Sequence, residues 1–418
     1  MTRSGRKPIV LIVIDGLTPA MLEATDTPAL RFLLDHGTYR RAASTFPSLT
    51  PVCLASIATG GHGDVHGIPH LVWWNRDEER LVEYGSSFAA LRASGLTQGI
   101  RDSVVGLNER HLLTSAETVY EAVEDAGLTA AAINITTYRG RHVHHSGVPG
   151  FPPVHGPKRF FFFSVYESDR TGAPIAWLSR AAGSIDAYAA SIGRWLVTRD
   201  GFDLLVFYLP DYDYASHALG PGVAHEALAR ADEAISALLE AAGGADAFLE
   251  RYGVVLCSDH GQSSVTQTAR LAAGGARVAA SNRAAMLYGS DPRSLAESLD
   301  GERSVDVALF LEDDRVVVRR DGVEDLAILD EYPDGLARAE GALRNPNAGD
   351  VLVSARAGWD FADLAGRHHA GGGSHGSLIA ADSEVPMLTV GLGPPPDSIT
   401  GIKALVLAEL GLQVAAAA

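Results

Sequence analysis

Carboxylate and imidazole side chains recur beside short apolar runs in this 418-residue sequence. Six of them share this position: Asp15, Asp213, His217, Asp259, His260 and His375. In open α/β sheets, ligands bind outside the carboxyl ends of the strands. Carboxylates and imidazoles bind Zn²⁺, and they also accept Mn²⁺ or Fe. Taken singly, each residue could be a turn former or a loop cap, as could Asp211, but the set predicts a two-metal site for phosphoryl transfer.

A threonine precedes a proline in the stretch "SLTPVCLASIATGG", residues 48–61. Thr followed by Pro is a common helix start, with Thr as N-cap and Pro at the first helical position. The same place suits a nucleophile, because a helix N-terminus favours an alkoxide and an incoming phosphate. A metal ion or a base must also lower the pKa of the hydroxyl. Thr50 is therefore a candidate for a helix cap and for a nucleophile.

Five apolar runs predict buried strands, and the segments between them have helical patterns. The predicted strands begin at Pro8, Thr129, Phe202, Tyr252 and Val385. The predicted helices cover residues 18–36, 115–126, 181–197, 222–242 and 400–410. Strands that alternate with helices indicate an α/β fold around a mostly parallel sheet with both faces covered.

Two stretches interrupt this alternation. The first, residues 139–178, is rich in Gly, Pro, His and aromatic residues, and we expect a long excursion or lid. Its aromatics Phe160–Phe163, with Tyr138 just before it, either stack on a substrate or form a buried strand, which the pattern favours. The second contains a predicted β-hairpin that turns at residues 312–314. The expected division is a catalytic core of residues 1–264 and 349–418 and a small inserted α+β subdomain of residues 265–348.

Composition narrows the class of protein. The hydrophobic content of 46% is typical of a soluble globular chain, and the formal net charge of -17 argues against a nucleic-acid polymer as partner. No apolar run is long enough to span a bilayer, and Asp15 interrupts the signal-like N-terminal run. We therefore expect a cytoplasmic protein, as a monomer or homodimer and without a membrane partner. Its two cysteines, Cys53 and Cys257, are expected to be buried thiols.

Five motifs together resemble the alkaline phosphatase superfamily, most closely its nucleotide pyrophosphatase/phosphodiesterase (type I phosphodiesterase) branch and related phosphonate hydrolases. They are "VIDG", "FPSLTPVCLASIATG", "PDYDYASHALGP", "SDHG" and "GGSHGS". The resemblance implies an α/β three-layer sandwich with a mostly parallel central sheet flanked by helices. It also implies two zinc ions, one held by Asp15, Thr50, Asp259 and His260 and the other by Asp213, His217 and His375.

The resemblance further implies that Thr50 attacks phosphorus in line and forms a phosphothreonine intermediate. Thr45 also mimics the nucleophile motif, but it lies five residues too far from the Thr59–Gly60 pair. The implied function is hydrolysis of phosphodiester or pyrophosphate bonds in nucleotide-like or other small phosphate esters. The alternatives are a phosphonate C–P hydrolase, a phosphomonoesterase on the same metals, and an inactive metal-binding relative.

Two substrate contacts of these relatives are missing from the sequence. Relatives bind a phosphate oxygen with the backbone N–H that follows the nucleophile, but Pro51 has no N–H. Diesterase relatives also place an asparagine just beyond an "HG" pair, where this chain has Leu71 or its neighbour His70. The expected replacements in substrate binding are the Val52 N–H and either His70 or Asn75. The alternative for both side chains is that they are ordinary loop residues.

Overall fold

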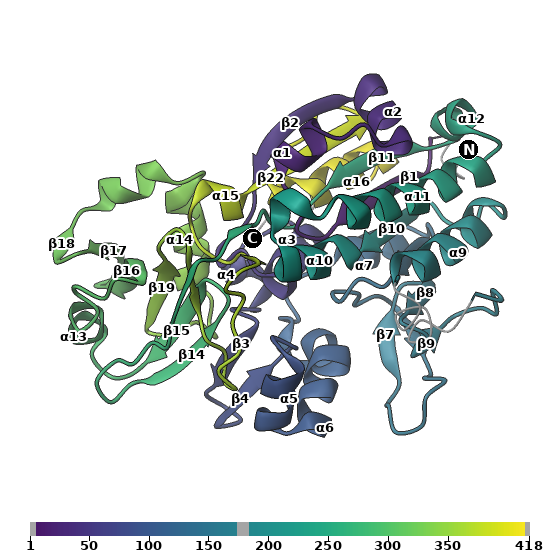
Figure 1. Ribbon diagram of the computed structural model, residues 1–418. Helices are drawn as coiled ribbons and strands as arrows, with labels where there is room; N and C mark the ends of the chain where they lie inside the picture. Colours follow the sequence, from purple (N-terminus) through teal and green to yellow (C-terminus); the bar gives the residue numbers. More distant parts are fainter. Residues whose placement is uncertain (1–5, 174–183, 414–418) are drawn as a thin grey trace.

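The computed structural model describes residues 6–173 and 184–413, and its centre is an eight-stranded mixed sheet (Figure 1). The strands are β1 (Ile9–Ile14), β2 (Thr38–Ala43), β5 (Ala130–Ile133), β8 (Arg159–Phe162), β9 (Tyr166–Glu167), β10 (Leu204–Leu209), β11 (Gly253–Cys257) and β22 (Glu384–Val390). Their order across the sheet is β2-β22-β11-β1-β10-β5-β8-β9. All five predicted strands are therefore confirmed as members of one sheet.

The core of this sheet is parallel and its edges are antiparallel. β1 pairs in parallel with β10 and β11, and β5 pairs in parallel with β10 and β8. β22 runs antiparallel to β11 and β2, and β9 runs antiparallel to β8. The carboxyl ends of β11, β1 and β10 consequently meet at the same edge of the sheet.

Helices cover both faces of the sheet. One face carries α1 (Pro19–Glu23), α2 (Pro28–His36), α9 (Asp186–Val197), α11 (His225–Ala241) and α12 (Ala245–Arg251). The other carries α3 (Thr50–Thr59), α7 (Val119–Asp125) and α16 (Ile402–Leu410). Alternate residues of β1 enter the two cores, because successive side chains of a strand point to opposite faces. This explains why β1 is a continuous apolar run.

The predicted helix over residues 18–36 is wrong as a single helix. The chain forms two helices, because Pro28 has no N–H for a continuing helix and disfavours helical backbone at Thr27. The other four predicted helices are found with later starts: α7 at Val119, α11 at His225, and α16 behind the 3-10 turn Ile399–Gly401. For the fourth, α9 begins at Asp186, and residues 181–183 of that prediction lie outside the described residues.

The start of α3 corrects the predicted cap. Leu49, with an extended backbone (φ -116°, ψ 138°), is the N-cap, and Thr50 is already the first helical residue. The Cys53 N–H donates to the Leu49 carbonyl at 3.0 Å, which is the first helical hydrogen bond. Pro51 is tolerated there, because the first N–H groups of a helix have no intrahelical partner. The Thr50 hydroxyl therefore has no capping role.

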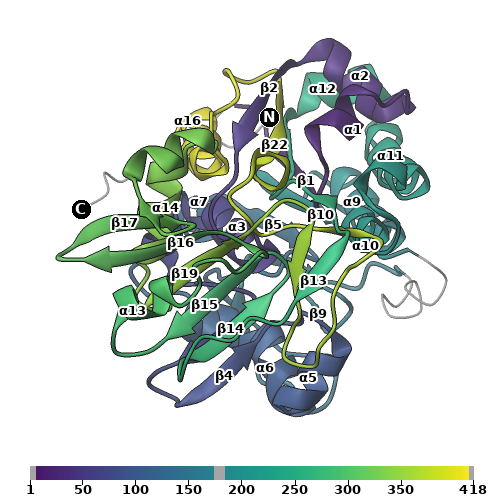
Figure 2. The same cartoon turned by 60° about the vertical axis from the view of Figure 1, so that its left-hand side comes forward.

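A second, six-stranded antiparallel sheet lies beside the first (Figure 2). Its strands are β14 (Arg277–Ser281), β15 (Ala284–Tyr288), β16 (Val305–Glu312), β17 (Arg315–Arg320), β18 (Val323–Glu324) and β19 (Val351–Ala355), with helices α13 (Pro292–Glu297) and α14 (Gly335–Leu343). The predicted hairpin is confirmed: Glu312 pairs with Arg315 across a turn of two positive-φ residues, Asp313 and Asp314. The sheet also includes β19, which lies beyond residue 348.

Several further elements pack beside the two sheets. They are the hairpin β3 (Val72–Asn75) and β4 (Arg80–Glu83), the helices α5 (Phe88–Ser94) and α6 (Leu96–Arg101), the π-helical segment η1 (Asp102–His111), and the hairpin β6 (His142–His144) and β7 (Val154–Gly156). The buried strand predicted within residues 139–178 is β8, which contains Phe160–Phe162. Among the described residues, no helix has the length and apolar character needed to cross a bilayer.

Candidate metal centre and active site

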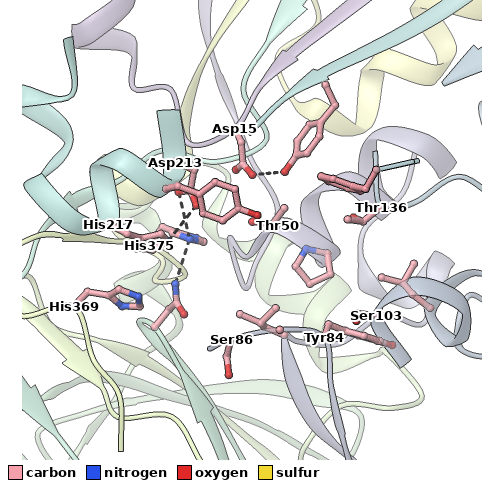
Figure 3. A pocket seen from close by; sticks show the side chains of 18 residues that line it. Asp15, Thr50, Tyr84, Ser86, Ser103, Thr136, Asp213, His217, His369 and His375 are labelled. Carbon is pink, nitrogen blue, oxygen red and sulfur yellow. Dashed lines mark hydrogen bonds and ion pairs between the residues drawn. The ribbon is translucent and has the colours of Figure 1, made fainter. Parts of the chain in front are cut away.

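The six predicted ligands converge at the carboxyl edge of β11, β1 and β10. Figure 3 shows Asp15, Asp213, His217 and His375, which also line a pocket. Asp15 directly follows β1, and Asp259 and His260 follow β11. Helix α10 (Asp211–Leu219) begins after β10 and presents Asp213 and His217 one helical turn apart. His375 follows the short strand β21 (Gly373–Ser374). The segments that follow β1 and β11, helix α10 after β10, and the segment after β21 therefore build the site.

The first group of candidate ligands contains the threonine hydroxyl. Asp15, Asp259 and His260 offer ligand atoms that all lie within 4.8 Å of one another. His260 Nε2 lies 3.3 Å from Asp15 Oδ1 and 3.5 Å from Asp259 Oδ2. The same nitrogen lies 3.1 Å from Thr50 Oγ1. The structure thus brings together the four residues that the resemblance assigns to one metal ion.

A second group lies directly beside the first. Asp213, His260 and His375 also offer ligand atoms within 4.8 Å of one another. His217 Nε2 lies 3.2 Å from Asp213 Oδ2, and His375 Nε2 lies 3.9 Å from Asp213 Oδ1. The rings of His260 and His375 stack with their centroids 3.6 Å apart. His260 therefore lies between the two groups.

Backbone carbonyls orient all three imidazoles. Nδ1 of His217 lies 2.8 Å from the Gly373 oxygen, and Nδ1 of His375 lies 2.8 Å from the Ser48 oxygen. Nδ1 of His260 lies 3.0 Å from the Gly261 oxygen. Donation of the Nδ1 proton to a carbonyl leaves the Nε2 lone pair free, and in each ring Nε2 faces the carboxylates. This is the tautomer that a metal ion requires.

The electrostatics of the carboxylates also fit bound cations. Asp15 Oδ1 and Asp259 Oδ2 are buried and make no hydrogen bond to the described residues. Burial raises the pKa of both carboxyls, and charge repulsion from Asp213 on Asp15 and from Asp15 on Asp259 raises it further. Buried oxygens without partners are unfavourable unless a cation pairs with them. The residues present therefore fit divalent metal ions.

Asp213 and His217 form an ion pair within this cluster. Burial disfavours the charged form of Asp213, but the facing His217 imidazole holds the pKa of that carboxyl below its usual range. Burial would lower the pKa of His217, but the Asp213 carboxylate raises it to about 9. Gln262 Nε2 also donates to Asp213 Oδ1 at 2.7 Å, and it fixes the orientation of this carboxylate.

The cluster opens into a cavity of about 320 Å³. The polar end of the cavity is lined by Asp15, Thr50, Asp213, His217, His375 and Tyr208. The Tyr208 hydroxyl donates a hydrogen bond to Asp15. The other lining residues are Pro51, Leu71, Tyr84, Gly85, Ser86, Ser103, Leu107, Thr136, Phe163, Tyr214, Asn282 and His369. Uncharged apolar, aromatic and hydroxyl side chains therefore dominate the walls that face the cluster.

One wall of the cavity comes from Leu71 and from residues between 84 and 107. The sequence pointed to Leu71 only as the place of a missing asparagine, and it did not predict the others. The turn after β4 is held by the Glu83 carboxylate, which accepts from the Gly85 N–H at 2.8 Å and the Ser86 N–H at 2.6 Å. Ser103 and Leu107 lie on the π-helical η1, and π-helical turns often occur at functional sites. The Gly-Ser turn "YGSS" was a weak signal for this wall.

The structure does not bring the three expected replacement donors into the cavity. The Val52 N–H donates to the Leu49 carbonyl at 2.9 Å. Asn75 Oδ1 accepts the backbone N–H groups of Asp77 and Glu78, both at 3.0 Å, in the β3–β4 turn. His70 is buried outside the cavity lining, with Nδ1 3.1 Å from the Val72 nitrogen, and burial lowers its pKa to about 4.

The other sequence candidates also have defined places. Asp211 accepts from the Ser184 hydroxyl at 2.9 Å and from the Asp186 N–H at 3.0 Å, so it holds the start of α9. The Thr45 hydroxyl lies 2.8 Å from His62 Nδ1 and outside the cavity lining. Within residues 139–173, Phe163 alone lines the cavity, and Tyr138 is buried.

The helix-flanked mixed sheet, with Asp, His and Thr residues at its carboxyl edge, has the alkaline phosphatase-like fold. A sequence model described as type I phosphodiesterase / nucleotide pyrophosphatase matches residues 9–378. The chain therefore belongs to the type I phosphodiesterase / nucleotide pyrophosphatase family. A comparison with curated proteins finds no match.

Solved structures share this fold along nearly the whole chain. Murine ectonucleotide pyrophosphatase / phosphodiesterase 5 is 13% identical with a TM-score of 0.67, and the match covers 97% of this chain and 96% of that one. Phosphonoacetate hydrolase from Sinorhizobium meliloti 1021, in complex with phosphonoformate, is 20% identical with a TM-score of 0.66 and the same coverage of 97% and 96%. Human ectonucleotide pyrophosphatase / phosphodiesterase 5 is 14% identical with a TM-score of 0.66, covering 98% and 96%.

A buried ion pair joins the loops that carry the ligands. Arg283 and Asp382 are both fully buried, with Nη1 3.1 Å from Oδ1. Asp382 accepts from the Ser377 hydroxyl at 2.5 Å and from the Ser263 hydroxyl at 2.6 Å. The Arg283 N–H donates to the His375 carbonyl at 3.0 Å. The pair therefore connects the second sheet with the loops that follow His260 and His375.

Replacing Arg283 with methionine is expected to lower the free energy of unfolding by about 3–5 kcal/mol, because the buried Asp382 carboxylate loses its cationic partner. Urea denaturation followed by circular dichroism measures this change. The matched control is Arg344→Met, whose ion pair with Asp314 is exposed on both sides (40% and 79%) and should contribute little. Equal stability of Arg283→Met and wild type would contradict the prediction.

Proposed function

We propose that this protein is a dimetal hydrolase that cleaves phosphodiester or pyrophosphate bonds of small, nucleotide-like esters through a phosphothreonine intermediate. The observation that carries the proposal is the position of Thr50. Its hydroxyl is 3.1 Å from His260 Nε2, lies within a cluster of buried Asp and His side chains, and lines the cavity. The family to which the chain belongs supports the same reaction class.

The proposed ligands are Asp15, Thr50, Asp259 and His260 for one metal ion and Asp213, His217 and His375 for the other. Histidine and carboxylate donors favour Zn²⁺, and they also suit Mn²⁺ or Fe. When bound, the two ions lower the pKa of a hydroxyl and neutralise the charge of phosphoryl oxygens. The orphaned oxygens of Asp15 and Asp259 and the free Nε2 atoms support this ligand set.

The residues of the chain then perform a two-step displacement. Thr50 Oγ, after losing its proton to water, attacks phosphorus; the new P–O bond forms as the bond to the leaving oxygen breaks. Water then cleaves the Thr50–phosphorus bond, which releases the phosphate product and restores the hydroxyl. The N-terminus of α3 favours the alkoxide and the phosphate, because the dipole of a helix is positive at that end.

The cavity walls support an ester with an uncharged or aromatic substituent. Leu71 and Leu107 offer apolar surface, and Tyr84, Phe163 and Tyr214 offer aromatic surface opposite the cluster. Apolar walls with a few convergent polar groups are typical of small-molecule sites. The diester is therefore our first substrate class, ahead of monoesters and phosphonates.

The test is a substrate panel on zinc-loaded wild-type protein, with metal content counted on the same samples. The panel contains bis-para-nitrophenyl phosphate, the para-nitrophenyl ester of thymidine 5′-monophosphate, para-nitrophenyl phosphate and phosphonoacetate. We expect two metal ions per chain and a kcat/KM for the diesters at least about tenfold above that for the monoester. A preference for the monoester or for phosphonoacetate would overturn the diester assignment. Two bound metal ions without any turnover would identify an inactive relative.

A further inference from the structure

The backbone donor and the asparagine that relatives use for a phosphate oxygen are missing from the nucleophile end of the cavity. Pro51 has no N–H, the Val52 N–H is bonded to the Leu49 carbonyl, and Leu71 is apolar where diesterase relatives place an asparagine. An anionic oxygen in a partly buried site needs such donors, because each one stabilises the charge of the transition state. A donor on another wall of the cavity would replace these two groups.

Asn282 is placed to supply it. This residue follows β14 in the second sheet, is 4% exposed and lines the cavity. Its backbone is left-handed (φ 56°), a conformation that costs energy in a residue other than glycine and clusters at functional sites. Hydrogen bonds hold this conformation: the Phe361 N–H donates to the Asn282 carbonyl at 2.6 Å, and the next residue, Arg283, donates to the His375 carbonyl at 3.0 Å.

The orientation of the Asn282 amide is defined by its two neighbours. Oδ1 accepts from the Ser281 hydroxyl at 2.8 Å, so Nδ2 faces the ligand cluster. Nδ2 lies 3.2 Å from Nε2 of His375, and Nδ1 of that ring is bonded to the Ser48 carbonyl. The amide therefore donates to the lone pair that His375 would use as a metal ligand.

Resting on the proposed function, we propose that the Asn282 side-chain amide donates a hydrogen bond to a phosphoryl oxygen of the substrate. The Nε2 lone pair of His375 cannot bind a metal ion and accept the Asn282 N–H at the same time. A buried N–H that loses its acceptor is unfavourable by about 1–3 kcal/mol, so the amide needs a new partner when His375 binds metal. A phosphoryl oxygen on the His375 side of the site is that partner. The second sheet thereby contributes a substrate-binding residue.

Two variants separate this role from a structural one. Asn282→Gly removes the amide and tolerates the left-handed backbone, because glycine adopts positive φ freely. Asn282→Asp keeps the shape and the acceptor for Ser281 but has no N–H. Each is compared with wild type for zinc content, for kcat/KM on bis-para-nitrophenyl phosphate, and for the dissociation constant of inorganic phosphate measured by calorimetry.

We expect both variants to keep two zinc ions, to lose about 10²–10³-fold in kcat/KM, as removal of an oxyanion donor does, and to bind phosphate at least about tenfold more weakly. The matched control is Asn347→Ala, which removes an asparagine outside the cavity lining, where its amide donates to the Gly67 carbonyl at 2.7 Å. It should change neither quantity more than about twofold. Activity and phosphate affinity within threefold of wild type in Asn282→Gly would overturn the proposal.

Two other results would have a different meaning: loss of zinc from the variants, and absence of turnover in the wild type. Loss of zinc from Asn282→Gly and Asn282→Asp would also overturn the proposal, because it would make Asn282 a positioning residue for His375. Absence of turnover in the wild type would refute the proposed function instead. The phosphate titration does not depend on turnover, and it would still decide between a donating and a structural Asn282.

Discussion

Thr50→Ala is expected to lower kcat/KM for a phosphodiester by about four orders of magnitude or more, because the variant has no oxygen that can attack phosphorus. The fold should be unaffected. Leu49 is the N-cap of α3, and the Thr50 hydroxyl makes no capping hydrogen bond, so alanine removes no helix-stabilising contact. The measurements are steady-state kinetics on bis-para-nitrophenyl phosphate, metal content and the midpoint of urea unfolding.

Two controls make the Thr50 result specific. Thr45→Ala removes the other threonine of the motif, which contacts His62 outside the cavity lining, and it should retain activity within about threefold. Thr50→Ser keeps a hydroxyl at the same atom position and should recover a large part of the lost rate. Full activity in Thr50→Ala would show that another group, such as Thr45 or a bound water, is the nucleophile.

Removal of the metal ions is expected to abolish turnover and to lower the melting temperature by about 5–10 °C, since a ligand that binds only the folded state stabilises it. The physical reason lies in the cluster. Asp15, Asp213 and Asp259 are buried together, and without cations two of their oxygens have no hydrogen-bond partner among the described residues. Their repulsion then opposes folding.

The pH dependence of the metal-free protein follows from the same residues. The pKa of His217 is raised to about 9, and those of Asp15 and Asp259 are also raised. A group whose pKa is higher in the folded than in the unfolded state contributes stability at low pH that is lost as the pH rises through the folded-state pKa. The metal-free protein should therefore melt at a lower temperature at pH 9 than at pH 7.

Differential scanning fluorimetry at pH 7 and pH 9, on chelator-treated protein with and without added zinc, tests both statements. Zinc should raise the melting temperature more at pH 9, because metal binding requires deprotonated ligands. An unchanged melting temperature and undiminished turnover after verified metal removal would show that the cluster works without metal ions.

The sequence alone singled out the Asp and His residues of the candidate cluster, because its signals are local. An apolar run that ends in Asp15 or in the Asp259–His260 pair predicts a buried strand and also places the polar residue at the carboxyl end of that strand. Parallel pairing of β1 with β10 and β11 then brings these ends together without further information. The spacing of Asp213 and His217 likewise follows from one turn of helix.

Local signals misjudged the start of α3. The motif Thr-Pro favours Thr50 as the cap, but the extended backbone of Leu49 occurs in a loop that is held by distant segments. The Ser48 hydroxyl donates to the Ser377 carbonyl at 3.0 Å, and the fully buried Arg338 donates to the Thr45 carbonyl at 3.2 Å. Contacts of this kind override the local preference.

Only the tertiary structure shows which residues form the walls of the cavity. The β4–α5 turn with Ser86, η1 with Ser103, and the second sheet with Asn282 are far apart in the chain, and each carries ordinary loop or strand residues. They share one cavity only because two sheets and a hairpin pack around the same edge. The sequence by itself therefore identified the polar residues of the candidate site. Packing between distant segments decided which side chains surround the substrate, because no local pattern records those contacts.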